Sequence, residues 1–298
     1  MRQAFPFLVL LFGTFAANGQ SPKEKFIKYG LQVDRAKTAA AHGRHQQAMA
    51  IYDSAFALVP FMAYDYFDAV LNALAAGRDD KANDLLIQAT ENGFKVESRY
   101  DPALQEFLLS ERSMPYLNMR DYMKERWLAH ADTTMIRKLT KVGSWTILLE
   151  DDNGALSYST DPAAFERLLS LARERGWPTP LNVGSAFYMT QNLLLEQLDN
   201  YPDNPRWQQV LPYIRSAMDR GALPPDYLAP FQDMENIKQG KPMAYGILLS
   251  YYREDPSKWY VVDHASLEKN RRSVGLGSIE DFLFRYDLDP SLMRYAEP

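Results

Sequence analysis

The chain has 298 residues, which is enough for about two domains of roughly 100–200 residues each. It is 46% hydrophobic and 24% charged, as in soluble globular proteins, and its net charge of −5 argues against a protein that mainly grips nucleic acid or an anionic membrane. It contains no cysteine, which excludes disulfide scaffolds, cysteine nucleophiles, redox CxxC sites and thiolate zinc sites.

The first residues predict a secretory signal peptide over residues 1–19. Arg2 precedes an apolar run over residues 4–17, and Ala17-Asn18-Gly19 offers a small-residue cleavage pattern. The run is too short for an uncleaved anchor, which needs about 20 apolar residues, and no later segment is long and apolar enough to insert stably in a membrane. The mature chain is therefore expected in the periplasm or the surrounding medium.

An internal repeat with an offset of 34 residues follows. A turn and two small-residue positions recur in register: Gly43 with Gly77, Ala48 with Ala82, and Ala55 with Ala89. This period and these positions resemble the tetratricopeptide (TPR) repeat, over residues 24–94. An irregular third helix pair is expected over residues 101–109 and 113–130, with Asp101 as N-cap before Pro102. The TPR-like domain thus spans residues 20–133.

The TPR resemblance implies a concave groove that binds a protein or peptide partner. Arrays of two or three repeats also brace neighbouring domains, and the repeat alone does not choose between these roles. No nucleic acid partner is expected.

Residues 134–160 predict a hairpin or an ordered linker, because β-prone segments flank Asn153-Gly154. The acidic cluster that ends at Gly154 fails as a calcium loop, since Leu149 stands where an acidic or amide residue is needed and Thr160 where a glutamate is needed.

The C-terminal domain, residues 161–298, is expected to be mostly helical. Its apolar spacing and caps predict helices over residues 161–176, 183–199, 205–221, 226–239 and 278–285. Residues 244–252 and 259–262 predict a short β-hairpin. The fold class is therefore mainly α, with TPR-like helical hairpins followed by a mostly helical domain that carries this hairpin.

Residues 161–283 also resemble a bacterial domain family of unknown function, whose signature runs GWP, VG, QHAD, DR, YGTQ and RRxxxGL. The matching residues occur in the same order: Gly176-Trp177-Pro178, Val183-Gly184, Glu196-Gln197-Leu198-Asp199, Asp233-Met234, Tyr245-Gly246-Ile247-Leu248, and Arg271-Arg272 followed by Gly275-Leu276.

Where the chain departs from this signature, it lacks side chains that could transfer protons or bind metals and anions. Gln197 replaces the family's histidine and can only hydrogen-bond, whereas histidine shuttles protons near neutral pH or binds metals. Met234 replaces an arginine and so lacks its permanent charge and its bidentate grip on anions. We therefore lean towards a domain that is not an enzyme.

The polar residues that remain define the candidate site. If the domain is catalytic, Asp199 or Asp233 would act as general base and Arg272 would bind an anion. Residues of the same signature that could contact a ligand are Trp177, Gln197, Tyr245 and Arg271. The structural alternative, which we favour, makes Trp177 a core residue and gives the aspartates capping and helix-pairing roles. No metal or cofactor is expected.

The sequence thus favours an exported, non-catalytic interaction protein that binds a protein or peptide partner through its TPR-like groove. The alternatives are a hydrolase-type enzyme, or a small-ligand binding module, built on Asp199, Asp233 and Arg272. The enzyme requires these three side chains to share one cleft.

Overall fold

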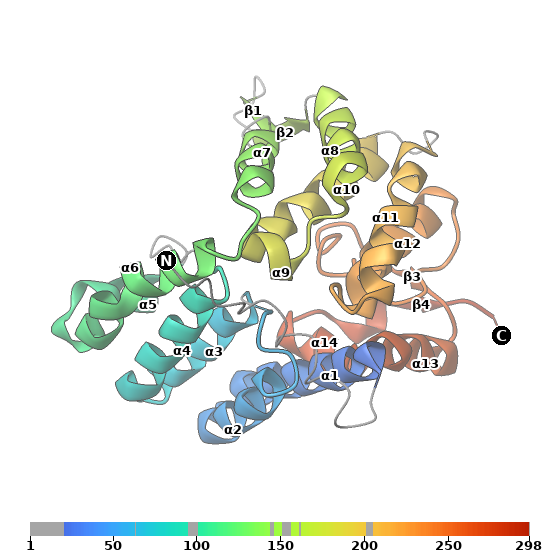
Figure 1. The fold of residues 1–298 in the computed structure, drawn as a ribbon. Coiled ribbons are helices and arrows are strands. Elements are labelled where there is room, and N and C mark those ends of the chain that lie inside the picture. Colours follow the sequence, from blue (N-terminus) through green and yellow to red (C-terminus); the bar gives the residue numbers. More distant parts are fainter. Residues whose placement is uncertain are drawn as a thin grey trace.

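The computed structural model describes residues 21–62, 64–94, 101–143, 146–150, 156–160, 162–200 and 205–297. The expected signal peptide lies outside these residues. The described chain is mainly α-helical, as predicted (Figure 1). None of its helices is both long and apolar enough to cross a membrane.

The N-terminal region is built from successive helix pairs. Its first two pairs are α1 (Pro22–Ala41) with α2 (His45–Phe56) and α3 (Asp65–Ala75) with α4 (Asp79–Glu91). Gly43 and Gly77 adopt φ angles of 71° and 67° in the turns within the two pairs, a conformation that favours glycine. The alanines that recur at the 34-residue offset, at positions 48, 82, 55 and 89, are fully buried, so that neighbouring helices approach closely.

The expected third helix pair is confirmed as α5 (Pro102–Leu109) and α6 (Met114–Leu128). Asp101 caps α5 as predicted, since its carboxylate accepts the N–H groups of Ala103 and Leu104 at 2.8 and 3.2 Å. Buried Asn83 of α4 ties this pair to the preceding one: it accepts the N–H of Tyr116 at 3.0 Å and donates to the carbonyl of Arg112 at 2.9 Å. Helix α7 (Thr133–Gly143), which the sequence did not predict, follows.

Strands β1 (Thr146–Glu150) and β2 (Leu156–Thr160) pair antiparallel, with Leu148 opposite Tyr158. They lie in the segment where the sequence predicts a hairpin or an ordered linker. The residues between them, 151–155, lie outside the described part of the chain.

The C-terminal region is again mostly helical. Its helices are α8 (Pro162–Arg175), α9 (Pro180–Val183), α10 (Tyr188–Asn200), α11 (Leu211–Asp219), α12 (Ala229–Lys238), α13 (His264–Val274) and α14 (Ile279–Arg285). The predicted helices over 161–176 and 278–285 correspond to α8 and α14. The three predicted between them begin as short 3-10 turns, at η4 (Gly184–Phe187), η5 (Pro205–Gln209) and η6 (Pro225–Leu228).

The predicted hairpin of residues 244–252 and 259–262 is wrong. Strand β3 (Tyr260–Val261) instead pairs in parallel with β4 (Arg294–Tyr295), near the end of the chain. The first predicted strand fails because Ala244, Tyr245 and Ile247 donate their backbone N–H groups to the carboxylate of Asp233. A strand ladder would need those same donors.

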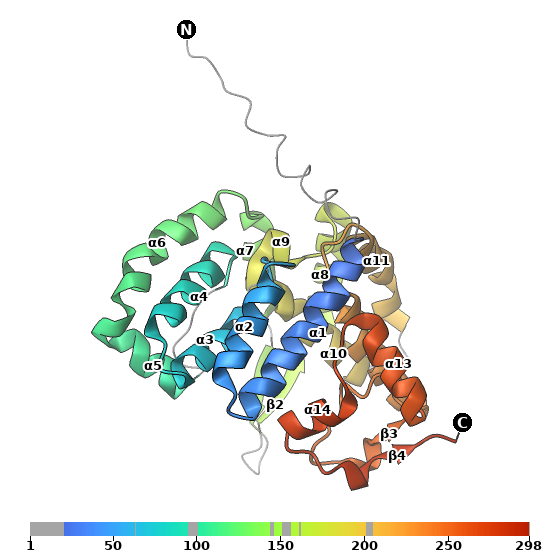
Figure 2. The ribbon, with the colours of Figure 1, turned by 90° about the horizontal axis from the view of Figure 1, so that it is seen from below.

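The C-terminal helices pack back on the first helix of the chain. Helices α13 and α14 lie beside α1 in both views (Figures 1 and 2). Gly30 of α1 lets the backbones meet, since a Cβ there would lie 2.5 Å from the carbonyl oxygen of Gly275. Asp34 accepts the N–H of Gly277 at 2.6 Å and pairs with Arg285 at 2.9 Å. One hydrophobic core consequently extends from Phe26 to Met293.

Candidate functional site

Asp233, the proposed general base, is a fully buried residue of α12. Its two oxygens accept the N–H groups of Ala244, Tyr245 and Ile247 at 2.7, 2.9 and 2.9 Å. Burial raises the pKa of Asp233 to about 6, against the opposing effect of these hydrogen bonds. The carboxylate therefore anchors a loop.

Arg271 holds the same loop through a carbonyl group. This fully buried guanidinium donates to the carbonyl oxygens of Tyr245 and Gly277, both at 2.7 Å, and lies 5.2 Å from the ring centre of Phe282. Burial lowers its pKa. Asp233 and Arg271 thus fix the Tyr245 backbone through its N–H and its C=O. Both oxygens of Asp233 accept hydrogen bonds within the fold, whereas Nη2 of Arg271 has no hydrogen-bond partner among the described residues.

Arg272, the proposed anion binder, faces another part of the surface. Its side chain is 73% exposed, lies 3.8 Å from Glu268, and lines a cavity of about 620 Å³ between α1 and the segment that joins α13 to α14. Asp233 does not line this cavity, and the side chain of Asp199 in α10 lies outside the described part. The shared cleft that the enzyme hypothesis requires is therefore not formed by Asp233 and Arg272.

Trp177 and Gln197 are also internal. The Trp177 indole is 1% exposed and donates to the hydroxyl of Tyr227 at 3.2 Å, which in turn bonds Thr190 at 2.8 Å. Gln197 is 4% exposed, and neither of its amide atoms has a hydrogen-bond partner among the described residues. Neither residue lines the cavities around α3 or beside Arg272.

A more open site lies along α3 in the N-terminal region. One cavity of about 360 Å³ separates α3 from α5, and a second of about 400 Å³ lies between α3, α1 and the end of α14. Leu71 and Ala75 of α3 line both cavities, so the two adjoin. We call this pair of cavities the α3 groove.

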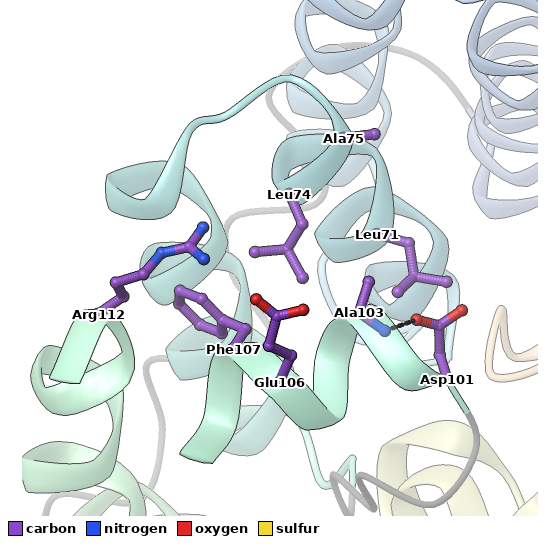
Figure 3. A pocket seen from close by; sticks show the side chains of 8 residues that line it. All are labelled: Leu71, Leu74, Ala75, Asp101, Ala103, Glu106, Phe107 and Arg112. Atoms are coloured by element: carbon purple, nitrogen blue, oxygen red, sulfur yellow. Dashed lines mark hydrogen bonds between the residues drawn. The ribbon is translucent and has the colours of Figure 1, made fainter. Parts of the chain in front are cut away.

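Acidic and apolar side chains line the α5 end of the α3 groove. Leu71, Leu74 and Phe107 give it an apolar surface, and the Glu106 carboxylate points into the cavity (Figure 3). Glu106 makes no hydrogen bond or ion pair within the described ranges. Arg112 lines the same cavity, but its guanidinium donates two hydrogen bonds, of 2.7 and 2.5 Å, to the carboxylate of Asp79. The available charge at this end is negative.

A polar network lies at the α1 end of the groove. Lys37 pairs with Asp65 at 3.4 Å and with Asp68 at 2.9 Å, and the Tyr29 hydroxyl donates to Asp65 at 2.6 Å. From the C-terminal region, α14 adds Arg285, whose side chain is only 10% exposed and pairs with Asp34.

The aromatic ring of Tyr286, next to α14, completes the wall at this end of the groove. Tyr286 lines the second cavity, and the preceding Phe284 stacks on His42 at 4.1 Å between ring centres. Both regions of the chain therefore shape the α3 groove.

No known protein family, curated protein or solved structure matches this chain significantly.

Proposed function

We propose that the protein is an exported interaction protein with TPR-like helix pairs, and that its α3 groove binds a segment of a partner protein. The segment would present apolar side chains to α3 and α5 and at least one basic side chain to Glu106. The observation that carries the proposal is the pair of adjoining cavities, joined at Leu71 and Ala75, with an unpaired Glu106 carboxylate pointing into one of them among the described residues.

The size and chemistry of the groove support a peptide. Each cavity has the volume of a small-ligand site, and together they offer neighbouring pockets for successive side chains. Apolar surface supplies most of the affinity in such grooves, while an exposed carboxylate chooses between partners of opposite charge. Asp101 and Glu106 give the α5 end of the groove two carboxylates, which favours a basic segment over an acidic one.

The test is selection of binders from a random peptide library on the purified full chain. Affinities of the selected peptides would be measured by fluorescence anisotropy. Ala75 is exposed at the junction of the two cavities, so Ala75→Arg places a bulky cation there. We expect this substitution to weaken binding by about tenfold or more, because it fills the groove and repels a basic peptide.

Ala57→Arg is the matched control, since Ala57 is also exposed, at the end of α2, but lines neither cavity. It should leave the affinity unchanged. A library that yields no binders, or peptides that bind the Ala75→Arg and Ala57→Arg variants equally well, would count against the proposal.

A further inference from the structure

Three metal-ligating side chains converge where α13 meets α14, away from the α3 groove. His264 is the first residue of α13, Glu268 lies one turn later on the same face, and Glu280 lies in the first turn of α14. One ligand atom from each of the three residues lies within 4.8 Å of the others. His264 Nε2 and Glu280 Oε1 are 2.7 Å apart.

The donor set and its support suit a transition metal. An imidazole with two carboxylates is a ligand combination used for Zn²⁺ and its neighbours. Glu268 Oε1 accepts the N–H of Ile279 at 2.7 Å, which fixes the orientation of this carboxylate as outer hydrogen bonds do in metal sites. His264 and Glu280 are 54% and 63% exposed, so an ion can enter and water can complete its coordination.

One neighbouring cation competes for the same place. The Nε atom of Arg272 lies 3.8 Å from the second oxygen of Glu268, and the arginine side chain is otherwise 73% exposed. A divalent ion at the three ligands would meet repulsion from this guanidinium, which can swing into solvent because it is so exposed.

We propose that His264, Glu268 and Glu280 bind a divalent transition-metal ion, with Zn²⁺ as the probe, and that the ion links α13 to α14. Because α14 carries Arg285, which lines the α3 groove, the bound ion would stiffen one wall of that groove. The site stands on its own residues and does not depend on peptide binding.

The experiment is calorimetric titration of Zn²⁺ into the full chain, purified without an affinity tag. We expect one ion per chain, and a loss of affinity of about tenfold or more in His264→Ala and in Glu280→Gln. Both residues are more than half exposed, so both variants should keep the wild-type circular dichroism spectrum. His130→Ala removes another exposed imidazole and should bind Zn²⁺ as the wild type does.

Arg272→Gln separates this site from generic surface binding. Removing the competing charge should tighten Zn²⁺ binding several-fold, whereas a site elsewhere would not respond. Wild-type affinity in His264→Ala, or an unchanged or weaker affinity in Arg272→Gln, would overturn the proposal.

Discussion

The two regions of this chain use charged side chains in opposite ways. In the C-terminal region, Asp233 and Arg271 are fully buried and bond to the backbone of one loop. In the N-terminal region, Asp101 and Glu106 line an open cavity, and Glu106 makes no hydrogen bond or ion pair within the described residues. The sequence singled out the C-terminal residues as candidate site residues, yet the N-terminal residues are the ones that a partner can reach.

Polar side chains that cluster in a candidate site, such as Asp233 and Arg271, can therefore serve to stabilise the fold. A buried carboxylate with three N–H donors satisfies backbone groups that no strand or helix satisfies, because the loop at Tyr245 is irregular. Such residues can be essential without touching a ligand. If the contrast is correct, substitutions in the two regions should differ in which measurement they change.

The largest effect is expected for Asp233→Ala. It leaves three N–H groups without their buried acceptor, so we expect the free energy of unfolding to fall by about 3–5 kcal/mol. Urea denaturation followed by circular dichroism measures this. Arg272→Ala, at an exposed position, should change stability by about 0.5 kcal/mol or less. If Asp233→Ala lowered the free energy of unfolding by less than about 1 kcal/mol, Asp233 would not have the structural role assigned to it here.

The next effect concerns the junction of the two regions, at Asp226 in η6. Burial, followed by the nearby carboxylates of Asp65 and Asp34, raises the pKa of Asp226 to about 7, and Lys37 opposes the rise. An unfolded aspartate has a pKa near ~3.9, so between pH 4 and 7 the unfolded chain loses this proton while the folded chain keeps it. This group therefore makes the protein less stable as the pH rises through that range.

Asp226→Asn abolishes this titration. We expect the variant to gain stability relative to the wild type as the pH rises from 4 to 7, by up to about 4 kcal/mol. Urea denaturation at a series of pH values measures the difference. Asp84→Asn, at an exposed position of α4, serves as control and should follow the wild-type profile. Parallel profiles for wild type and Asp226→Asn would show that the junction does not hold a proton.

Much of the N-terminal architecture could be predicted, because its contacts are local in sequence. The recurring glycines and alanines mark turns and helix contacts. The same 34-residue offset also relates residues that line the α3 groove: Lys37 to Leu71, Ala40 to Leu74, and Ala41 to Ala75. The offset could therefore have indicated the groove residues, although only the turn glycines and the buried alanines were assigned from it.

The C-terminal arrangement could not be predicted in the same way, because it depends on contacts distant in sequence. The hairpin expected near Tyr245 failed since Asp233, eleven or more residues earlier, takes the donors it needed. The packing of α14 on α1, through Arg285 and Asp34, joins residues more than 200 positions apart. For the cluster of His264, Glu268 and Glu280, the sequence carries one signal, which is the four-residue spacing of the first two residues.

A smaller effect should separate capping from binding at Asp101. Its carboxylate accepts two N–H groups at the start of α5 and also lines the α3 groove. Asp101→Ala should cost about 1 kcal/mol of stability as a lost N-cap and should also weaken a bound basic peptide. Asp101→Asn keeps a capping oxygen and should lose affinity with little loss of stability, in denaturation and anisotropy measurements on the same samples. Equal stability losses in both variants would mean that the cap needs the charge.

The smallest effect is expected at Glu106, where stability should not change at all. Its exposed carboxylate makes no hydrogen bond or ion pair among the described residues and has only a longer-range attraction to Arg112, so Glu106→Gln should unfold as the wild type does. A basic peptide selected on the wild type should bind this variant more weakly by about 0.2–1 kcal/mol, the usual size of an exposed ion pair, and the difference should shrink as salt is added. The same substitution tested with a neutral peptide provides the control. An equal loss for the neutral peptide would mean that Glu106 acts by shape, whereas a loss confined to the basic peptide would identify the charge in the α3 groove that chooses the partner.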